Sequence, residues 1–394
     1  MELYRLYCPI CGEKHDLKKL FERKFAVDTQ LFPFESYDIM FCKKCGMIYA
    51  GNIDSNRGWN EYYSDTSKYE NVNMSVPLST ISKYKIEMDI FQKYLSINTR
   101  VIDIGCGNGK MLSLMREGGF KHLTGVEISK KNIEFINTCY GIPAYVGDLE
   151  HLDALGDNKF QLVILNGVLE HVLNLQASIA NVLQYIVDGG YVFLAVPALE
   201  QFIYYTNLYQ QFSSEHVNYF SKISLKNLLE RYGLELCEYR NALGTGFSLW
   251  KKTKVFNIKS VCFDRQGEYQ INKYLSNCHD LFIRVKRRLM ELGGNQKLYI
   301  WGAGTHTAVL FQLGVLDDFD VMGIVDANIN FTDYNAYGHK IIFAGNFRDE
   351  RYPILISSQY SQNEIEIYIR NNLKLKNQII KLYTDEEVGT CYPV

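Results

Sequence analysis

The sequence predicts an α/β protein built from a cysteine-rich N-terminal module and two parallel-sheet domains, the second smaller than the first. Short β-branched runs alternate with helical patterns from about residue 80 to residue 253, which is typical of strand–helix–strand units on a parallel sheet. The same alternation resumes after a polar stretch near residues 264–293, whose apolar residues recur at helical spacing. We therefore expect domains over residues 1–70, 80–253 and 254–394.

The β-branched runs predict the positions of the strands. In the first domain the expected strands cover residues 100–104, 123–127, 144–147, 162–165 and 191–195, followed by an antiparallel hairpin of residues 234–239 and 247–251. In the second domain they cover residues 298–301, 321–325, 341–344 and 354–357. We expect one long helix between the two domains, ended by Gly293-Gly294.

Composition and charge are those of an ordinary globular protein, with 47% hydrophobic and 22% charged residues among 394. The net charge of −2 gives no general attraction to nucleic acids or anionic membranes. The N-terminal residues lack the features of a signal peptide, and no apolar run reaches the roughly 18 residues of a membrane span. We expect a cytoplasmic protein whose ten cysteines stay reduced.

Four cysteines near the N-terminus have the spacing of a zinc site. They form two C-x2-C-G motifs, made by Cys8 and Cys11 and by Cys42 and Cys45. Four thiolates fill the tetrahedral shell of Zn²⁺ and leave no position for water, so the expected metal is structural. The alternative is a set of free thiols in turns.

A glycine-rich loop follows the first expected strand of the larger domain. Residues 103–109 read Asp-Ile-Gly-Cys-Gly-Asn-Gly, and we expect Asp103, Gly105 and Gly107 to line a cofactor. Glycines let the backbone approach a ligand, and open α/β sheets bind cofactors at the carboxyl ends of their strands. A domain that binds NAD would space its glycines G-x-G-x-x-G, whereas this loop reads G-x-G-x-G.

Polar side chains also end the next three strands. Glu127, with Ile128 beside it, is placed to accept hydrogen bonds from both hydroxyls of a ribose. Asp148 ends the third strand, where it can reach an adenine amino group, and Leu149 can pack on the adenine ring. Asn166 ends the fourth strand. Four successive strand ends of this kind favour S-adenosylmethionine over NAD.

Together these residues resemble the class I S-adenosylmethionine-dependent methyltransferase family across about residues 80–253. The resemblance implies a Rossmann-like domain with S-adenosylmethionine as the methyl donor. The run of residues 168–172, Val-Leu-Glu-His-Val, is usual in the branch of that family that acts on small molecules. It implies that His171 lies at the pocket, either as a lining residue or as a base.

Residues 213–221, Ser-Ser-Glu-His-Val-Asn-Tyr-Phe-Ser, are similar to the E-H-x-x-Y-F-S segment of sugar C-methyltransferases that act on nucleotide-linked deoxysugars. That family also has a four-cysteine zinc site, a tyrosine pair matched here by Tyr62 and Tyr63, and a C-terminal Rossmann-like domain. The resemblance implies that His216 removes a proton next to a keto group and that Glu215 supports it. It also implies that Tyr62, Tyr63 and Tyr219 contact the substrate.

The sequence departs from that family at two positions. Ser213 stands where the family has a tyrosine, and Gly167 stands where it favours an asparagine, with Asn166 displaced by one residue. Both departures bear on the C-methylation chemistry, whereas the expectation of S-adenosylmethionine does not depend on them.

A second glycine loop, residues 300–307, reads Ile-Trp-Gly-Ala-Gly-Thr-His-Thr and precedes a strand that ends at Asp326. Gly302 and Gly304 are the positions that we expect to contact a ligand. Amide groups at a helix N-terminus can hold the diphosphate of a sugar nucleotide. The alternatives are an NAD site, although Thr307 occupies the third glycine position, and a purely structural domain.

These observations predict an enzyme that methylates a nucleotide-linked sugar, with C-methylation of a keto-deoxysugar favoured over O-methylation. An RNA methyltransferase is the rival from another class, but it would carry a basic surface that the net charge does not supply. A two-cofactor protein with an NAD-dependent C-terminal oxidoreductase domain is the third possibility. The sequence identifies neither the sugar nor the oligomeric state.

Overall fold

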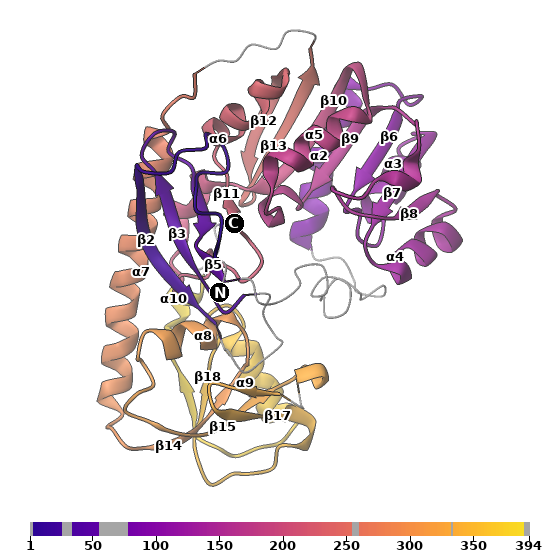
Figure 1. Cartoon of the computed structure of the whole chain (residues 1–394). Coiled ribbons are helices and arrows are strands. Elements are labelled where there is room, and N and C mark those ends of the chain that lie inside the picture. The colour runs from indigo at the N-terminus through magenta and orange to yellow at the C-terminus, as the bar shows by residue number, and fades with distance from the viewer. Residues whose placement is uncertain (1–2, 26–33, 55–77, 254–259, 332–333, 390–394) are drawn as a thin grey trace.

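A seven-stranded sheet forms the larger domain of the computed structural model, which describes residues 3–25, 34–54, 78–253, 260–331 and 334–389 (Figure 1). Its strand order is β12-β13-β10-β9-β6-β7-β8, and all neighbours are parallel except those of β13. The strands are β6 (Arg100–Ile104), β7 (His122–Glu127), β8 (Ala144–Val146), β9 (Phe160–Asn166), β10 (Ile186–Pro197), β12 (Leu234–Ala242) and β13 (Thr245–Lys252). The five predicted strands and the antiparallel hairpin are therefore confirmed.

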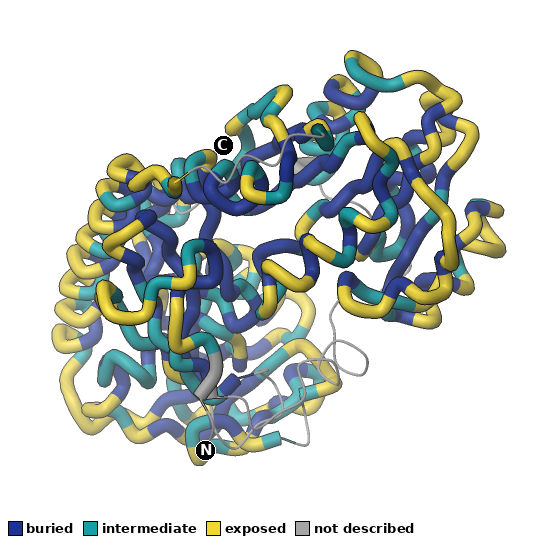
Figure 2. The backbone as a smooth tube through the Cα atoms, turned by 45° about the horizontal axis from the view of Figure 1, so that its top comes forward, coloured by how far each residue is buried: buried dark blue, intermediate teal, exposed yellow. Residues whose placement is uncertain are grey.

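Helices cover both faces of this sheet because its central strands are apolar on both sides. In β10, Val192 and Leu194 pack in one cluster with Ile179, whereas Phe193 packs in the opposite cluster with Phe91. The helices are α2 (Leu78–Tyr94), α3 (Lys110–Glu117), α4 (Lys130–Phe135), α5 (Leu175–Gln184) and α6 (Lys222–Leu229). Figure 2 shows how the buried residues follow the strands while exposed residues lie on the outer helices and loops.

The sheet of the N-terminal module contains a strand from the larger domain. Its order is β11-β4-β3-β2, with the strands β2 (Leu17–Lys24), β3 (Ser36–Cys42), β4 (Ile48–Gly51) and β11 (Asn218–Tyr219). A separate pair joins β1 (Leu3–Tyr4) to β5 (Ile53–Asp54). The module and the segment that follows β10 thus form one structural unit. The expected domain of residues 1–70 does not include this segment.

The predicted connecting helix is α7 (Arg265–Glu291), which runs beside the N-terminal strands down to the second sheet (Figure 1). The Asp264 carboxylate begins the helix by accepting a hydrogen bond of 2.8 Å from the amide of Gly267. The buried residues of its inner face recur at spacings of three and four; they are Ile271, Tyr274, Cys278, Leu281, Val285 and Leu289. This face packs in the same cluster as the N-terminal sheet and the second sheet.

The second sheet has the order β16-β17-β15-β14-β18-β19 and is parallel except for β16. Its strands are β14 (Lys297–Trp301), β15 (Asp320–Asp326), β16 (Asn335–Ala336), β17 (His339–Phe343), β18 (Ile354–Ile356) and β19 (Ile379–Lys381). Its helices are α8 (Thr305–Gln312), α9 (Gln362–Asn371) and α10 (Asp385–Gly389). Four of these strands were predicted, whereas the short β16 and β19 were not.

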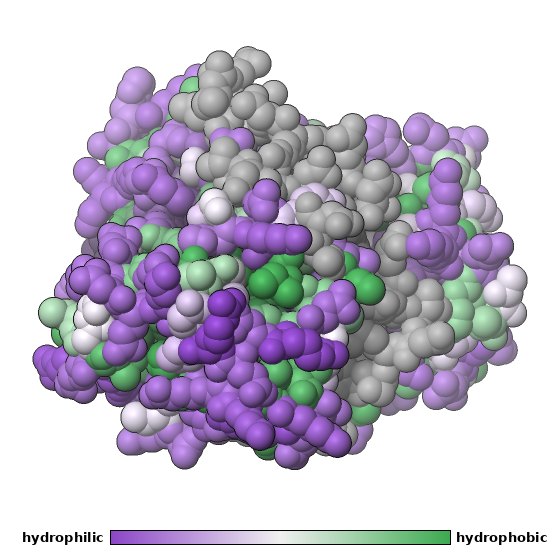
Figure 3. All heavy atoms as spheres, turned by 90° about the horizontal axis from the view of Figure 1, so that it is seen from below, coloured by the Kyte–Doolittle hydropathy of each residue, from purple (hydrophilic) through white to green (hydrophobic). Residues whose placement is uncertain are grey.

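The surface of the described residues is largely hydrophilic when viewed from below, with small apolar areas near its centre (Figure 3). Among the described residues, no helix combines the length and the apolar character needed to cross a membrane.

Candidate donor site, acceptor-side residues and cysteine cluster

The four cysteines predicted to bind zinc converge at one point. Their sulfur atoms lie within 4.8 Å of one another, with Cys8 Sγ 3.6 Å from Cys45 Sγ and Cys11 Sγ 3.5 Å from Cys42 Sγ. Sulfur atoms on one tetrahedral Zn²⁺ lie about 3.8 Å apart, given a Zn–S bond of about 2.3 Å. The donor set and its spacing therefore fit a four-thiolate zinc ion.

The turns around the cysteines explain why each motif ends in glycine. Gly12 and Gly46 have φ angles of 73° and 80°, where side chains other than that of glycine are strained. Their amides donate to the carbonyl oxygens of Cys8 and Cys42 at 3.0 and 2.8 Å. Asp264 packs closely on Gly46: a Cβ added at Gly46 would lie 2.7 Å from the Cβ of Asp264. The cluster is thereby fixed against the start of α7.

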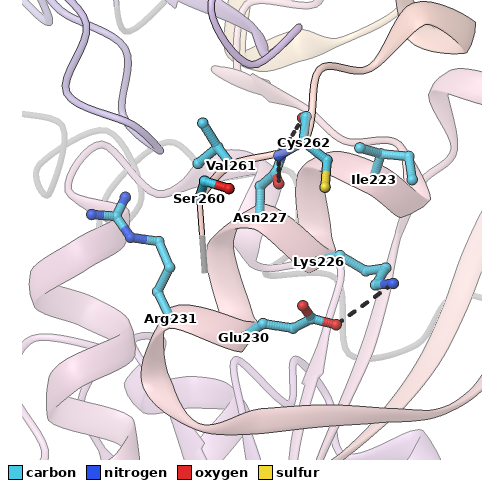
Figure 4. Close-up of a pocket in the computed structure, with 8 residues that line it drawn as sticks. All are labelled: Ile223, Lys226, Asn227, Glu230, Arg231, Ser260, Val261 and Cys262. Atoms are coloured by element: carbon cyan, nitrogen blue, oxygen red, sulfur yellow. Dashed lines mark hydrogen bonds and ion pairs between the residues drawn. The ribbon is translucent and has the colours of Figure 1, made fainter. Parts of the chain in front are cut away.

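A small hollow lies between α6 and residues 260–262, near the cysteine turns (Figure 4). Asn227 Nδ2 donates to the carbonyl oxygen of Cys262 at 2.7 Å, and Asn227 Oδ1 accepts from the Cys262 amide at 2.8 Å. Arg231, on the other side of the hollow, donates to the carbonyl oxygen of Ile10. These bonds hold the segment that leads into α7 in place. The residues around this hollow therefore have a structural role.

The first glycine loop has the geometry expected of a cofactor loop. Gly105, Gly107 and Gly109 have φ angles of 75°, 54° and 73°. A Cβ at Gly105 would lie 2.7 Å from a methyl carbon of Val168, so the loop contacts the segment after β9. A Cβ at Gly107 would meet nothing within 4 Å, so this face of the loop is open to a ligand.

Two carboxylates flank this loop. Glu127 accepts hydrogen bonds from the amides of Gly107 and Ser129 at 2.9 and 3.1 Å, and burial raises its pKa. Asp103 is 2% exposed, and burial, with the nearby charge of Glu127, raises its pKa to about 7. Asp103 Oδ1 has no hydrogen-bond partner among the described residues. A buried acceptor without a partner, next to an open glycine, is the arrangement that a cofactor bearing an ammonium group and hydroxyls would complete.

The other predicted cofactor residues lie at the same edge of the sheet. Asp148 follows β8 and accepts from the amides of Glu150 and His151 at 2.7 and 2.9 Å, which closes a turn. Leu149 is buried beside the central strands, and Ile128 is half-buried after β7. The structure thus brings the predicted strand-end residues to one edge.

A buried group that the sequence analysis did not name lies on α2. Glu87 is 1% exposed, and both of its oxygens accept from Asn166 Nδ2 at 3.0 Å. Burial, with the charge of Asp103, raises the pKa of Glu87 to about 8. Lys83, one turn earlier, lies near enough to interact with it. An acidic residue on the same helical face as Ile90 and Phe91 is the pattern that would have identified Glu87.

The two histidines of the predicted acceptor side lie together although 45 residues separate them in the sequence. Their ring centroids are 4.8 Å apart at an interplanar angle of 78°, and His171 Nδ1 lies 3.0 Å from the carbonyl oxygen of Glu215. Ser213 Oγ accepts from the amide of His216 at 2.9 Å and from that of Glu215 at 3.2 Å. Ser213, where the resembling family has tyrosine, therefore forms the turn that holds the Glu-His pair.

The N-terminal module supports this turn from behind. Arg5 donates to the carbonyl oxygen of Val217 at 2.8 Å, and the Tyr37 hydroxyl donates to that of Ser213. Tyr219 is 3% exposed, and its hydroxyl donates to the carbonyl oxygen of His216 at 2.9 Å. These contacts give Tyr219 a positioning role toward His216, and its substrate contact stays a prediction. The other predicted substrate tyrosines, at positions 62 and 63, lie outside the described residues.

The second glycine loop resembles the first in its backbone and differs in its side chains. Gly302 has a φ of 110°, and a Cβ on Gly304, before α8, would meet nothing within 4 Å. Asp326 accepts from the amides of Ala303 and Asn328, both at 2.7 Å. Thr307, at the third glycine position, donates its hydroxyl to the carbonyl oxygen of Gly302, and its Oγ1 lies 2.7 Å from Ser357 Oγ.

A buried histidine extends this hydroxyl network. His306 Nδ1 lies 2.9 Å from Ser357 Oγ, and its Nε2 contacts the Tyr383 hydroxyl. Burial lowers the pKa of His306 to about 3, so its ring is neutral. The sequence analysis did not identify this group, because its partners lie 51 and 77 residues further along the chain.

Residues 64–239 match the family described as a methyltransferase domain. This part of the chain is a class I S-adenosylmethionine-dependent methyltransferase domain. The protein is accordingly an S-adenosylmethionine-dependent methyltransferase.

Similar proteins include two curated sequences and many solved structures. Protein 235L of Invertebrate iridescent virus 6, described as a methyltransferase, is 24% identical over 260 residues, which are 64% of this chain and 85% of that protein. The ubiquinone biosynthesis O-methyltransferase of Aromatoleum aromaticum is 29% identical over 101 residues, 24% of this chain and 43% of that protein. The structure of magnesium protoporphyrin IX methyltransferase from Synechocystis aligns with a TM-score of 0.40 and 14% identity, over 49% of this chain and 98% of that one.

Proposed function

We propose that this enzyme transfers the methyl group of S-adenosylmethionine to a sugar carried on a nucleotide, with C-methylation of a keto-deoxysugar as the favoured reaction. The observation that carries the proposal is the convergence of Glu215, His216 and His171 beside the segment that contacts the donor loop. The matching E-H-x-x-Y-F-S segment supports the same acceptor class.

The residues that would hold the donor are those around the first glycine loop. Glu127 would accept hydrogen bonds from the ribose hydroxyls, Asp103 would accept from the ammonium group, and Gly107 would leave room for the chain of the cofactor. When bound, S-adenosylmethionine supplies an electrophilic methyl group.

On the acceptor side we assign the proton transfer to His216. In a keto sugar its imidazole would take the proton next to the carbonyl group, which leaves an enolate as the nucleophile. The backbone of His216 is fixed by Ser213 at its amide and by Tyr219 at its carbonyl, so the ring starts from a defined position. Such positioning is the main contribution that a protein makes to an in-line transfer.

We further propose that the second sheet is a Rossmann-like domain that holds the nucleotide of the substrate. Its open Gly304, the N-terminus of α8 and the Asp326 carboxylate form the same arrangement as the donor loop. The amides at the start of α8 would bind the diphosphate. The second sheet also contacts the acceptor-side segment, because Thr305 donates to Gln210 Oε1 at 3.1 Å and Gln359 donates to the carbonyl oxygen of Thr206.

We assign a structural zinc ion to the cysteine cluster. The ion would hold the turns that follow β1 and β3, and this sheet is completed by β11, directly after His216. Zinc would therefore contribute to the placement of the acceptor-side turn without taking part in the chemistry.

The experiment that tests the proposed function is methyl transfer from labelled S-adenosylmethionine to a panel of acceptors. The panel contains 4-keto-6-deoxy and hydroxy sugars on nucleoside diphosphates, the same sugars without the nucleotide, and transfer RNA. We expect transfer to the nucleotide-linked sugars alone. Transfer to RNA, or equal transfer to the free sugars, would contradict the proposal.

O-methylation is the second candidate, because one similar protein is an O-methyltransferase. The position of the label separates the two reactions. A methyl group on carbon supports C-methylation, and a methyl ether shows O-methylation.

A further inference from the structure

Three metal-ligating side chains meet where the segment after β9 faces the segment before β11. Glu170, His171 and His216 each offer one ligand atom, and these atoms lie within 4.8 Å of one another. Ligands that share one divalent ion lie roughly 3–4 Å apart, so small side-chain movements bring all three onto one ion. We propose that these residues, the acceptor-side triad, bind a divalent transition-metal ion.

Glu170 supplies the first argument. Its side chain is 3% exposed, and Glu170 Oε2 has no hydrogen-bond partner among the described residues. A buried carboxylate is costly unless it is paired, protonated or bound to a metal. Gly167 lies next to this group, because a Cβ added at Gly167 would lie 3.9 Å from Glu170 Oε1. As a glycine it has no side chain to cover the carboxylate. The carboxylate also offers a ligand atom that lies within 4.8 Å of those of the two histidines.

The orientation of His171 supplies the second argument. Its Nδ1 lies 3.0 Å from the carbonyl oxygen of Glu215, where an N–H donates. Metal-bound histidines commonly donate one ring nitrogen to a carbonyl or a carboxylate in this way. The same bond links His171 to the residue next to His216.

The two segments that carry the triad are tied together by their backbones. The Val217 amide donates to the carbonyl oxygen of Glu170 at 2.7 Å. Asn218 Nδ2 donates to the carbonyl oxygens of Leu169 and Val172 at 2.8 and 2.7 Å. The triad is therefore held on a rigid frame, as an ion-binding site requires.

Two imidazoles and one carboxylate leave coordination positions open, which is typical of metal sites that also bind a substrate. The triad lies beside the donor loop through the contact of Gly105 with Val168. An oxygen atom of the acceptor can fill an open position. The ion and the proton transfer compete for the imidazole of His216, so His216 acts as the base in the enzyme that is free of the ion. This inference deepens the proposed function and rests on it only for the identity of the acceptor.

Cobalt(II) titration of the full-length protein tests the site. The protein is first shown to hold one zinc per chain and is freed of weakly bound ions. We expect one Co²⁺ per chain with the weak visible absorption of nitrogen and oxygen ligands. Exchange into the cysteine cluster would give intense sulfur-to-cobalt bands, so the two sites are distinguished.

Variants of the triad identify the ligands. Glu170→Gln and His216→Ala should each weaken Co²⁺ binding by at least the ~10–100-fold that loss of an outer-shell partner costs. His122→Ala, which replaces an exposed histidine at the start of β7, should bind Co²⁺ as the unchanged protein does. The circular dichroism spectrum confirms that each variant is folded, and if Glu170→Gln does not fold, His216→Ala serves alone.

The inference is wrong if the protein binds no Co²⁺ beyond the cysteine cluster, or if both triad variants bind it unchanged. Co²⁺ binding together with no methylation of sugar nucleotides by the protein freed of Co²⁺ would instead contradict the proposed function and leave the metal site standing. Methylation of sugar nucleotides without Co²⁺ binding would support the proposed function and contradict the metal site.

Discussion

Glu127 in the first sheet and Asp326 in the second occupy equivalent places and make the same kind of contacts. Each ends the strand that pairs with the strand before the glycine loop. Each accepts one hydrogen bond from an amide of that loop and one from the amide two positions further along the chain. Burial raises the pKa of both carboxyl groups. The carboxylate at the strand end thus makes the same hydrogen bonds in the two sheets.

The two loops differ in what surrounds the carboxylate. The first loop has three glycines in the left-handed conformation and a buried carboxyl group, Asp103, whose Oδ1 has no hydrogen-bond partner in the described part of the chain. In the second loop Thr307 replaces a glycine, and its hydroxyl joins Gly302 to Ser357. In the second loop an internal hydroxyl network supplies hydrogen bonds that a ligand would otherwise make, so this loop can be stable without a ligand.

The largest expected effect belongs to the acceptor side of the first sheet. His216→Ala should slow methyl transfer by the ~10²–10⁴-fold typical of losing a positioned base, because the variant lacks the imidazole that takes the proton. The affinity for S-adenosylmethionine should remain nearly unchanged. Turnover and donor affinity are measured on the same protein preparation, with His122→Ala as the control. Turnover near that of the unchanged protein would exclude His216 from the mechanism.

The two carboxylates should differ in their effect on donor binding. Glu127→Ala should weaken S-adenosylmethionine binding by ~10–150-fold, since hydrogen bonds to a charged group contribute about 1.5–3 kcal/mol. Asp326→Ala should leave this affinity unchanged. Calorimetric titration measures both. Equal losses in the two variants would show that the two sheets are coupled and that the comparison does not separate their roles.

The stability of the first sheet should depend on pH through Glu87, which faces Asp103, Lys83 and Asn166. Burial raises the pKa of Glu87 to about 8, so the folded state keeps a proton that the unfolded chain releases near its ordinary value. Stability is therefore greatest below that ordinary pKa and falls as the pH rises towards and through about 8.

Glu87→Gln should flatten this dependence, and the remaining slope should come from Asp103, whose pKa is also raised. Thermal unfolding between pH 5 and pH 9 measures the effect at roughly 2–4 °C per kcal/mol. An identical pH dependence in the variant and the unchanged protein would contradict the assignment.

The smallest expected effect concerns the second loop. Gly304 has an ordinary φ of −84° and open space above it, so Gly304→Ala should leave thermal stability within about 0.5 kcal/mol of the unchanged protein. If a diphosphate passes over the loop, the added methyl group should weaken the binding of the nucleotide sugar severalfold. Unchanged binding would indicate that this loop is structural.

More of the fold than of the candidate site could be predicted from the sequence. The strands of both sheets follow from β-branched runs, and the cofactor residues follow from the ends of those strands, because parallel strands align their carboxyl ends. The pairing of β4 with β11 could not be predicted, since β11 has only two residues and its partner lies far away in the chain.

The groups missed at the sites are those defined by tertiary contact alone. Glu87 could have been found from its place on an apolar helical face, whereas the available oxygen of Glu170 and the Thr307–Ser357 bond depend on how distant segments meet. The contacts of Tyr219 could not be predicted for the same reason: nothing in its own segment shows that Tyr37 and Phe212 pack against it.

The shared strand β11 also constrains how the chain folds during synthesis. The cysteine motifs are complete by Cys45, but the sheet beside them lacks its last strand until Asn218 and Tyr219 have left the ribosome. At ~5–20 residues per second, about 170 residues take roughly 8–35 s. During that interval the thiols would be exposed to oxidation and to competing metals, so early zinc capture would favour a correct fold in the growing chain.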